Sequence, residues 1–347
     1  MASATIGTIR AAVRPVRGDD EAVRTAIRVR PRAARVHRGR HALRLILALC
    51  LIVSSAAFAA QPALAQPAPD CDRECLRGKV TEVLHALIHD DVGKLAVAGN
   101  LRVTEDGVEK PLAQVGLVRT VTRLRGYRQD VIDERAGEVV TGAMVEESGA
   151  PVILVVRAKV DGEARLSELE LVATRSRADG LLFNVDGLGG APALAMNLAP
   201  RPEQLETRDE AIRIAMYYPR GLSNAETFAA IGTPFAPTAY RFENGALMAG
   251  PGCAFAPGCA DIGNQSLAIF KTLGRVTVRD VVVDERMGIV MMRLSWNARG
   301  PGSDRLTAWE MFKVYDGQIH MVEAWIRLFP PELDLGGWPI AEGIVQP

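Results

Sequence analysis

Residues 131–140, VIDERAGEVV, recur as residues 282–291, VVDERMGIVM, and this duplicated stretch decides the fold. Six of the ten positions are identical, and a seventh exchanges one aliphatic residue for another. Asp-Glu-Arg-x-Gly between two Val-rich runs is typical of a β-hairpin in which glycine supplies the positive φ of the turn. The sequence therefore contains two copies of one hairpin unit.

Further markers extend the duplication on both sides, in the same order in each half. Upstream, TEDG at 104–107 pairs with FENG at 242–245, and downstream, KVDG at 159–162 is echoed by KVYDG at 313–317. A glutamate follows the last glycine at the same distance in both halves. Because Asp-Gly between alternating runs is a strong hairpin signal, each half is expected to end in a curved antiparallel sheet of about four strands.

Each half begins with a segment that has a helical pattern. Apolar residues recur at helical spacing from Leu76 onward, and this helix is expected to end near 90–93. A second helix is expected from Thr207 to Tyr218, with Thr207 and Glu210 forming a capping box. Helices followed by sheet predict an α+β fold in two tandem domains, at 70–178 and 205–330. Residues 179–204 are the expected connector, and 331–347 a Pro/Gly-rich tail.

Several motifs resemble the nuclear transport factor 2-like (SnoaL-like) superfamily. They are DDVGKL (90–95), RVTEDG (102–107), DERAG (133–137) and KVDGEARLSELE (159–170). RFENG (241–245) and FKVYDGQI (312–319) are similar to a tandem secreted group of that superfamily without settled activity. Over about 70–330, the resemblance implies two cone-shaped domains, each with N-terminal helices packed on a curved sheet. The superfamily includes isomerases, dehydratases and non-catalytic binders, and none of its catalytic motifs aligns here.

The N-terminal residues have the pattern of an export signal. Residues 1–44 carry eleven Arg and only three acids, and residues 45–65 carry no charge. The apolar run at 45–53 is too short to span a bilayer, which takes about 20 residues, and Ala63-Leu64-Ala65 is a typical cleavage site. A signal peptide within 1–65 is therefore expected. The long Arg-rich stretch before it favours a translation start further into the chain.

Charge and compartment follow from that leader. The whole chain has 41 basic and 41 acidic residues, whereas residues 66–347 have 30 basic and 38 acidic, a formal charge of −8. An acidic protein is a poor partner for nucleic acid or for an anionic membrane after signal cleavage. A periplasmic or secreted protein is predicted, with a small organic ligand as partner and homo-oligomerisation left open.

Four cysteines follow the leader: Cys71, Cys75, Cys253 and Cys259. An even number in an oxidising compartment favours disulfides, and three pairings are open. Cys253 and Cys259 bracket a Pro/Gly-rich loop that a local disulfide could close. Cys71 and Cys75, if both helical, would lie one turn apart, which strains a disulfide, so they are expected to pair only if the helix begins after them.

Glu310 is the leading candidate for chemistry. In the strand expected at 306–314 it shares a face with Leu306, Ala308, Phe312 and Val314, so it is a carboxylate in an apolar row. Desolvation there would raise its pKa toward general acid or base use. The alternatives are an ion pair with Arg293 or Arg327, or a place at an exposed edge. Alignment of the repeats puts Val156 at this position in the first half, which favours the second half as the active one.

Weaker candidates surround this strand. His320 could transfer a proton near neutral pH, and only one of His320 and Glu323 is expected to point inward. The substrate-binding candidates are Tyr240, Trp296, Phe312 and Glu323. Asp133 and Asp284 most simply cap their turns. No metal site and no cofactor is predicted, because no nucleotide-binding fingerprint stands in its structural context and His85 and His89 lie away from the apolar stripe of their helix.

The sequence thus predicts an exported, cofactor-independent enzyme of the lyase, dehydratase or isomerase type that acts on a small organic molecule. Glu310 would transfer the proton. The alternative is a non-catalytic protein for small-ligand binding or assembly. An open cavity in the second half with Glu310 at its wall would favour the enzyme, and a packed interior would favour binding or assembly.

Overall fold

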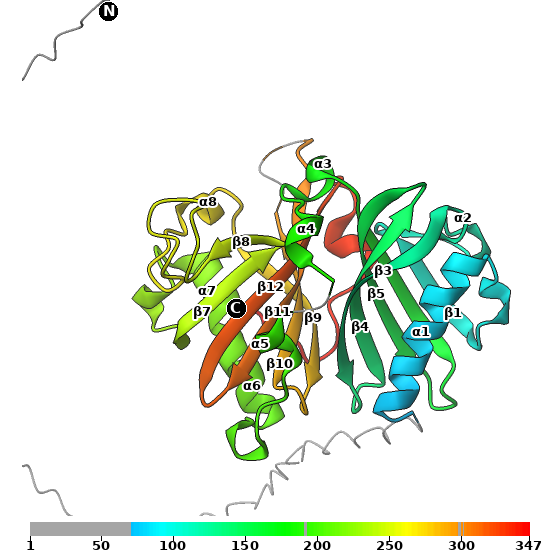
Figure 1. Ribbon diagram of the computed structural model, residues 1–347, viewed down its shortest axis with the longest axis horizontal. Coiled ribbons are helices and arrows are strands. Elements are labelled where there is room, and N and C mark those ends of the chain that lie inside the picture. The colour runs from blue at the N-terminus through cyan, green and yellow to red at the C-terminus, as the bar shows by residue number, and fades with distance from the viewer. Residues whose placement is uncertain (1–70, 191–192, 298–299, 301) are drawn as a thin grey trace, which may run out of the picture. The chain divides into compact units, whose positions relative to one another are not determined.

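The computed structural model describes residues 71–190, 193–297, 300 and 302–347; the signal peptide expected within 1–65 lies outside them. The described chain is built around two six-stranded sheets (Figure 1). The first contains β1 (Val97–Glu105), β2 (Val108–Glu109), β3 (Val121–Asp133), β4 (Glu138–Glu147), β5 (Ala150–Val160) and β6 (Leu166–Thr174), in the order β2-β1-β6-β5-β4-β3. The second contains β7 (Phe235–Glu243), β8 (Ala246–Ala249), β9 (Val276–Asp284), β10 (Ile289–Trp296), β11 (Arg305–Tyr315) and β12 (Gln318–Phe329), in the order β8-β7-β12-β11-β10-β9.

The helices are short, apart from the first. They are α1 (Arg73–His89), α2 (Leu117–Thr120), α3 (Arg177–Gly180), α4 (Val185–Leu188), α5 (Leu194–Asn197), α6 (Arg208–Ala215), α7 (Tyr217–Asn224) and α8 (Ala268–Lys271). Single 3₁₀ turns are η1 (Val92–Lys94), η2 (Leu112–Gln114), η3 (Pro202–Gln204), η4 (Ala229–Ile231) and η5 (Asp334–Gly337). Thr207 caps α6 by accepting a hydrogen bond from the Glu210 amide at 3.4 Å, which is half of the expected capping box, because the Glu210 carboxylate pairs with Arg213 instead.

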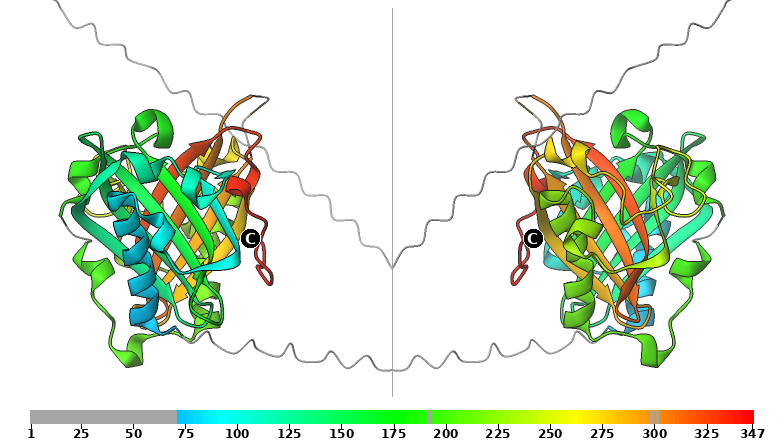
Figure 2. Two further views of the ribbon diagram at one scale, coloured as in Figure 1. Left: turned by 90° about the vertical axis from the view of Figure 1, so that its right-hand side faces the viewer. Right: turned by 90° about the vertical axis from the view of Figure 1, so that its left-hand side faces the viewer.

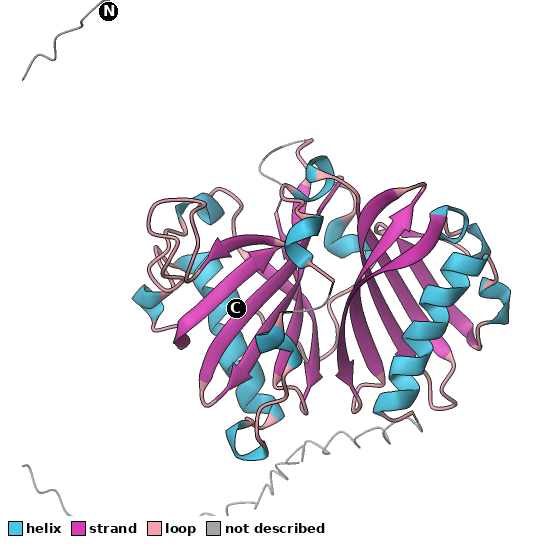
Figure 3. Cartoon of the chain, viewed as in Figure 1, coloured by secondary structure: helices cyan, strands magenta, loops and turns pink. Residues whose placement is uncertain are grey.

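The predicted α+β fold class, two cone-shaped domains with helices packed on a sheet, is wrong. The described chain is mostly β, with two sheets of six strands, and within it only α1 exceeds eight residues (Figure 3). The helix expected at 207–218 stops at Ala215 and a separate one follows at Tyr217. Nor are the sheets purely antiparallel, because β1 pairs in parallel with β6 and β7 with β12.

Apolar residues on both faces of the central strands explain this architecture. All residues of β10 are buried, as are the first eight of β4, so these strands cannot have a solvated face. One face of the first sheet packs on α1 through Leu76, Val80 and Val83, and Figure 2 shows this helix lying along the sheet. The corresponding face of the second sheet packs on α6 and α7. The remaining faces pack against each other, with Met291, Trp309 and Trp325 among the buried residues.

The hairpin turns predicted from the repeat are confirmed. Gly137 and Gly288 have φ of 62° and 58°, and each turn joins two antiparallel strands. Asp316 and Gly317 form a two-residue turn with φ of 49° and 72°, the conformation that favours Asp-Gly in hairpins. The Asp side chains cap as expected, since the Ala136 amide donates to Asp133 at 3.0 Å and the Met287 amide to Asp284 at 3.2 Å.

The repeated Asp-Glu-Arg turns also join the two halves, which the sequence analysis missed. Glu134 pairs with Arg286 at 2.9 Å, and Arg135 pairs with Glu285 at 3.1 Å. Such reciprocal contacts, in which residue i of one half meets residue j of the other and the reverse, are typical of a two-fold symmetric dimer. The tandem halves therefore associate as two subunits of a dimer would, within a single chain.

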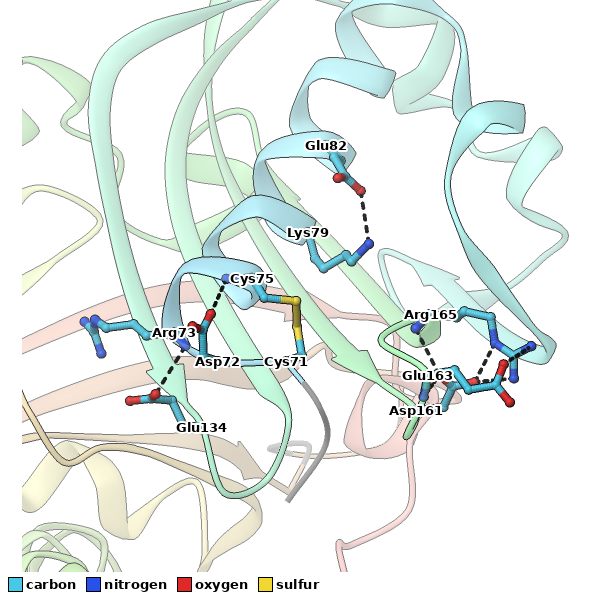
Figure 4. The surroundings of a disulfide bond; sticks show 10 residues. All are labelled: Cys71, Asp72, Arg73, Cys75, Lys79, Glu82, Glu134, Asp161, Glu163 and Arg165. Atoms are coloured by element: carbon cyan, nitrogen blue, oxygen red, sulfur yellow. Dashed lines mark hydrogen bonds and ion pairs between the residues drawn. A yellow bond between two sulfur atoms is a disulfide. The ribbon is translucent and has the colours of Figure 1, made fainter. Parts of the chain in front are cut away.

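Two disulfides form, Cys71–Cys75 and Cys253–Cys259. The expectation that Cys71 and Cys75 pair only if the helix begins after both is wrong, because α1 begins at Arg73, between them (Figure 4). Cys71 precedes the N-cap Asp72 in extended chain, so its Cα reaches within 5.1 Å of that of Cys75. Both disulfides fit an extracellular or periplasmic protein. Among the described helices, none is long and apolar enough to cross a bilayer.

The C-terminal segment packs against the first half of the chain. The indole N–H of Trp338 donates to Thr104 at 2.8 Å, and the Arg102 guanidinium lies 4.3 Å from the Trp338 ring centroid. Arg102 also donates to the Gly337 carbonyl at 2.5 Å. Gly337 and Trp338 therefore anchor the C-terminal segment on β1, whereas Ile340 and Val345 further along it are exposed.

Candidate functional site

A cavity of about 360 Å³ lies in the second half of the chain. Its walls come from β7, β8, β10, β11 and β12, from α7 and α8, and from the loop that the Cys253–Cys259 disulfide closes. Leu181 and Leu182, next to α3, complete the lining. This volume is in the usual range for small-molecule sites, and most of the lining side chains are apolar.

Polar side chains gather at one part of this lining: Tyr218, Arg241, Glu243, Gln265 and Glu310, here called the polar cluster. Arg241 Nη1 donates to the Tyr218 hydroxyl at 3.2 Å, and its Nη2 donates to Gln265 Oε1 at 2.8 Å. Arg241 Nε lies 2.7 Å from Glu243 Oε1 in an ion pair. The Tyr218 hydroxyl hydrogen-bonds the Glu310 carboxyl. Arg241 and Tyr218 thus connect two carboxyl groups.

Glu310 is 3% exposed and borders the cavity. Burial, reinforced by the nearby Glu243 carboxylate and opposed by Arg241 and the Tyr218 hydrogen bond, raises the pKa of Glu310 to about 8. At neutral pH its carboxyl group is therefore mostly protonated and can donate a proton. Arg293 and Arg327, the ion-pair partners considered in the sequence analysis, bind Glu170 and Asp179 instead.

Strand alternation and aromatic packing position the polar cluster. Glu310 faces the cavity from β11 together with Leu306 and Ala308, because alternate residues share one face of a strand. Tyr218 is held from α7 by ring contacts with Phe228 and Phe312, at centroid distances of 4.6 Å and 5.0 Å. Phe312, predicted to bind substrate, is therefore a packing partner of Tyr218.

The mouth of the cavity is apolar. Phe255, in the disulfide-closed loop, and Ile269, in α8, both line it and are each 61% exposed. Trp296, predicted to bind substrate, lines the cavity from β10 and packs on Phe270 with ring centroids 6.2 Å apart. Two solvent-exposed apolar side chains at the rim of an apolar cavity are an arrangement typical of a ligand entrance.

Besides Phe312, the structure places three further predicted site residues outside the cavity lining. Glu323 is buried between the two sheets, where it accepts a hydrogen bond from the Tyr127 hydroxyl at 2.7 Å, and burial raises its pKa to about 7. Tyr240 packs edge-on against Phe242. His320 stacks on Tyr315 with ring centroids 3.5 Å apart. Neither His320 nor Glu323 points into the cavity, although one of them was expected to.

The equivalent position in the first half carries no acid. Val156 pairs with Thr141 in β5 and β4, as Glu310 pairs with Met292 in β11 and β10. Val156 is fully buried in the apolar core beneath α1. The two halves share a hairpin plan but differ at the residue on which acid–base chemistry would depend.

A second group of buried charges lies between the sheets. Arg279 donates to both carboxylate oxygens of Glu170, at 3.0 Å and 2.5 Å, and Arg157 pairs with Asp280 at 2.9 Å and also with Glu138. Each of these acids faces an arginine, as buried charges require. This group connects the halves and does not border the cavity.

The site residues predicted from the sequence did not include Tyr218, Arg241, Glu243 or Gln265. Arg241 and Glu243 stand two apart in a strand, so they share a face, and this Arg-x-Glu spacing was the available signal. Their closeness to Glu310 depends on the parallel pairing of β7 with β12, which joins distant parts of the chain. In the described part of the chain, no three His, Cys, Asp or Glu side chains gather as a metal site.

The comparisons with known proteins assign no activity. A family model described as "Domain of unknown function (DUF8021)" matches residues 204–326, which contain the whole polar cluster. No curated protein matches the chain. Among solved structures, the chain is similar to one titled "Crystal structure of a de novo designed protein with curved beta-sheet", with 18% identity over 37% of this chain and 92% of that chain and a TM-score of 0.29. Neither description names a nuclear transport factor 2-like protein.

Proposed function

We propose that the protein is an exported, cofactor-independent enzyme, periplasmic or secreted, of the lyase or dehydratase type, acting on a small organic molecule in the second-half cavity. The observation that carries the proposal is a buried, mostly protonated Glu310 at the wall of an apolar cavity, hydrogen-bonded to Tyr218. A carboxylic acid kept neutral in a desolvated site is a common device for proton donation at neutral pH.

The chemistry that this arrangement suits is elimination of water. The Glu310 carboxyl gives its proton to a hydroxyl leaving group as the carbon–oxygen bond breaks, and water departs. The resulting carboxylate takes a proton from the neighbouring carbon as the double bond forms, which restores the acid. Between the two steps, Tyr218 and Arg241 stabilise the Glu310 carboxylate. The Tyr218 hydroxyl hydrogen-bonds Glu310 directly, and the Arg241 guanidinium donates to that hydroxyl.

The polar cluster also offers a specific reason to consider non-catalytic ligand binding. Arg241 already lies against Glu243, Gln265 and Tyr218, so these four side chains hold one another in place without a ligand. Preformed, internally paired polar groups suit a binding site that orients its ligand as well as they suit catalysis. The two functions differ in whether Glu310 must exchange its proton with the ligand.

Proton exchange at carbon separates these two functions without knowledge of the natural substrate. The protein is incubated in D₂O with 2-decanone or with 4-hydroxy-2-nonanone, and NMR follows deuterium uptake next to the carbonyl and loss of the hydroxyl. The proposal expects catalysed uptake or elimination that Glu310→Gln abolishes. Glu210→Gln is the matched control, because Glu210 is a surface residue that pairs with Arg213 on α6.

Both variants should keep the wild-type melting temperature within a few degrees. Catalysis that persists in Glu310→Gln would overturn the role of Glu310. No catalysis by the wild type on either compound, combined with tight binding of both, would establish the non-catalytic function instead.

A further inference from the structure

We infer that the ligand of the second-half cavity is electrically neutral: a largely hydrocarbon molecule whose hydroxyl or carbonyl oxygen lies against Arg241 and Glu310 while its chain extends toward Phe255 and Ile269. The inference rests on the proposed use of this cavity, and it names the class of molecule that enters it. Three features of the lining carry it: charge balance, hydrogen-bonding capacity and the apolar rim.

The charged groups in the cavity lining balance one another. The lining contains one basic residue, Arg241, and two acidic ones, Glu243 and Glu310. Arg241 is neutralised by its ion pair with Glu243, and burial keeps Glu310 in its neutral form. The cavity therefore has no net charge to offer. A carboxylate or an ammonium ion would have to lose its hydration without gaining a counter-ion, which is unfavourable.

Hydrogen-bonding capacity points to a ligand with few polar atoms. Both Nη atoms of Arg241 donate to protein partners, and its Nε lies beside the Glu243 carboxylate in an ion pair without an aligned hydrogen bond. Gln265 also donates from its amide to the Met248 carbonyl at 3.1 Å. Glu310 keeps a carboxyl group with a proton to donate and a second oxygen to accept. A single hydroxyl or carbonyl matches this capacity, whereas a sugar would bury hydroxyls without partners.

The apolar rim shows where the rest of the ligand lies. From the polar cluster the lining continues through Leu306, Ala308 and Trp296 to Phe270 and on to the rim residues Phe255 and Ile269. Exposing side chains of this size to water is unfavourable unless a ligand covers them. A hydrocarbon chain leading from the polar cluster to the mouth would cover both.

The test compares probes of one chain length that differ only in head group: 2-decanone and 2-decanol, which are neutral, decanoate, an anion, and decylammonium, a cation. Their dissociation constants are measured by displacement of the neutral dye Nile red at about pH 7. The inference expects both neutral probes to bind at least about tenfold more tightly than either ion. Equal or tighter binding of decanoate or decylammonium would overturn it.

Two variants test charge balance itself. Glu310→Gln leaves the cavity uncharged, so its preference for neutral probes should persist. Glu243→Gln combined with Glu310→Gln leaves Arg241 without a counter-ion, and this double variant should bind decanoate about tenfold more tightly than Glu310→Gln does. Unchanged decanoate affinity in a folded double variant would contradict the inference.

A wild-type measurement covers the case in which the double variant does not fold. Raising the pH from about 6 to about 9 ionises Glu310 and gives the cavity a negative charge, so decylammonium should gain affinity relative to 2-decanol. No such gain would count against the inference. These readouts record binding only, so neutral selectivity without proton exchange would leave the inference standing and remove the enzymatic proposal.

Discussion

Asp133 and Asp284 occupy equivalent places in the two halves, and each accepts hydrogen bonds from the helix that opens the other half. Both guanidinium Nη atoms of Arg73, in α1, donate to Asp284 at 2.8 Å, and those of Arg208, in α6, donate to Asp133 at 3.0 Å and 2.6 Å. Each Asp also accepts from a backbone amide of the opposite half, Asp284 from Ile132 and Asp133 from Val283. Each of these two aspartates therefore caps its own hairpin turn and also hydrogen-bonds the opposite half of the chain.

Replacing either aspartate should therefore destabilise the whole chain. Asp284→Asn is expected to lower the free energy of unfolding by about 3 kcal/mol, because it removes the charge that a largely buried Arg73 requires. Asp133→Asn should act similarly through Arg208. Glu285→Gln is the control, since its pair with the exposed Arg135 should contribute under about 1 kcal/mol. Urea denaturation measures all three, and equal effects for Asp284 and Glu285 would contradict the expectation.

Gly142 should not tolerate a side chain. A Cβ at this position of β4 would overlap the indole of Trp325 from the other sheet, which is itself buried. Gly142→Ala is expected to cost about 1–3 kcal/mol of stability through overpacking. Gly99→Ala, also in a strand but with open space around it, should be nearly neutral. Trp325→Leu should offset part of the Gly142→Ala loss in the double variant, and strictly additive losses would contradict direct packing.

Stability should fall as the pH rises from about 4.5 to about 8. The folded chain holds the proton of Glu310 to about pH 8 and that of Glu323 to about pH 7, whereas the unfolded chain releases both near 4.5. The folded state then binds more protons in this window, so raising the pH favours unfolding, by about 1.4 kcal/mol per unit for each group still protonated. Glu310→Gln should flatten the slope in urea denaturation, and an unchanged slope would argue against a protonated Glu310.

The proposed elimination should have a descending limb on its pH–rate profile. Since Glu310 donates the first proton, kcat/KM is expected to fall as the pH rises through about 8, the pKa of Glu310. Glu243→Gln removes a nearby negative charge and should move this limb to lower pH. A rate that instead rises through about 8 would show that Glu310 acts first as a base.

The two disulfides should have separable roles. Replacing Cys253 and Cys259 with serine frees the loop that carries Phe255, so Nile red binding should weaken several-fold while the fold persists. Replacing Cys71 and Cys75 with serine frees the start of α1 and should lower the melting temperature without changing dye affinity at temperatures where the protein is folded. The opposite pattern would show that the Cys253–Cys259 loop does not form the cavity wall.

Local signals in the sequence predicted local structure well. The turns at Gly137 and Gly288, the cap at Thr207 and the burial of Glu310 in an apolar strand all follow from residues close together in the chain. The fold class did not follow, because Met291 and its neighbours on the second face of β10 looked like ordinary strand residues, yet they bury that face against another sheet. Arg241 and Tyr218 could not be assigned because the contacts that bring them to Glu310 are non-local.

The difference between Val156 and Glu310 has a consequence for how such a protein can change. In a true homodimer, an acid introduced into one core appears in both, and each subunit loses the stability that a buried carboxyl costs. A single chain with two unequal halves avoids that constraint. The first half keeps an apolar residue, Val156, at this position of its core, while the second half accommodates an unfavourable buried acid beside an open cavity. The two halves of a tandem chain can therefore take different roles, whereas the identical subunits of a symmetric dimer cannot.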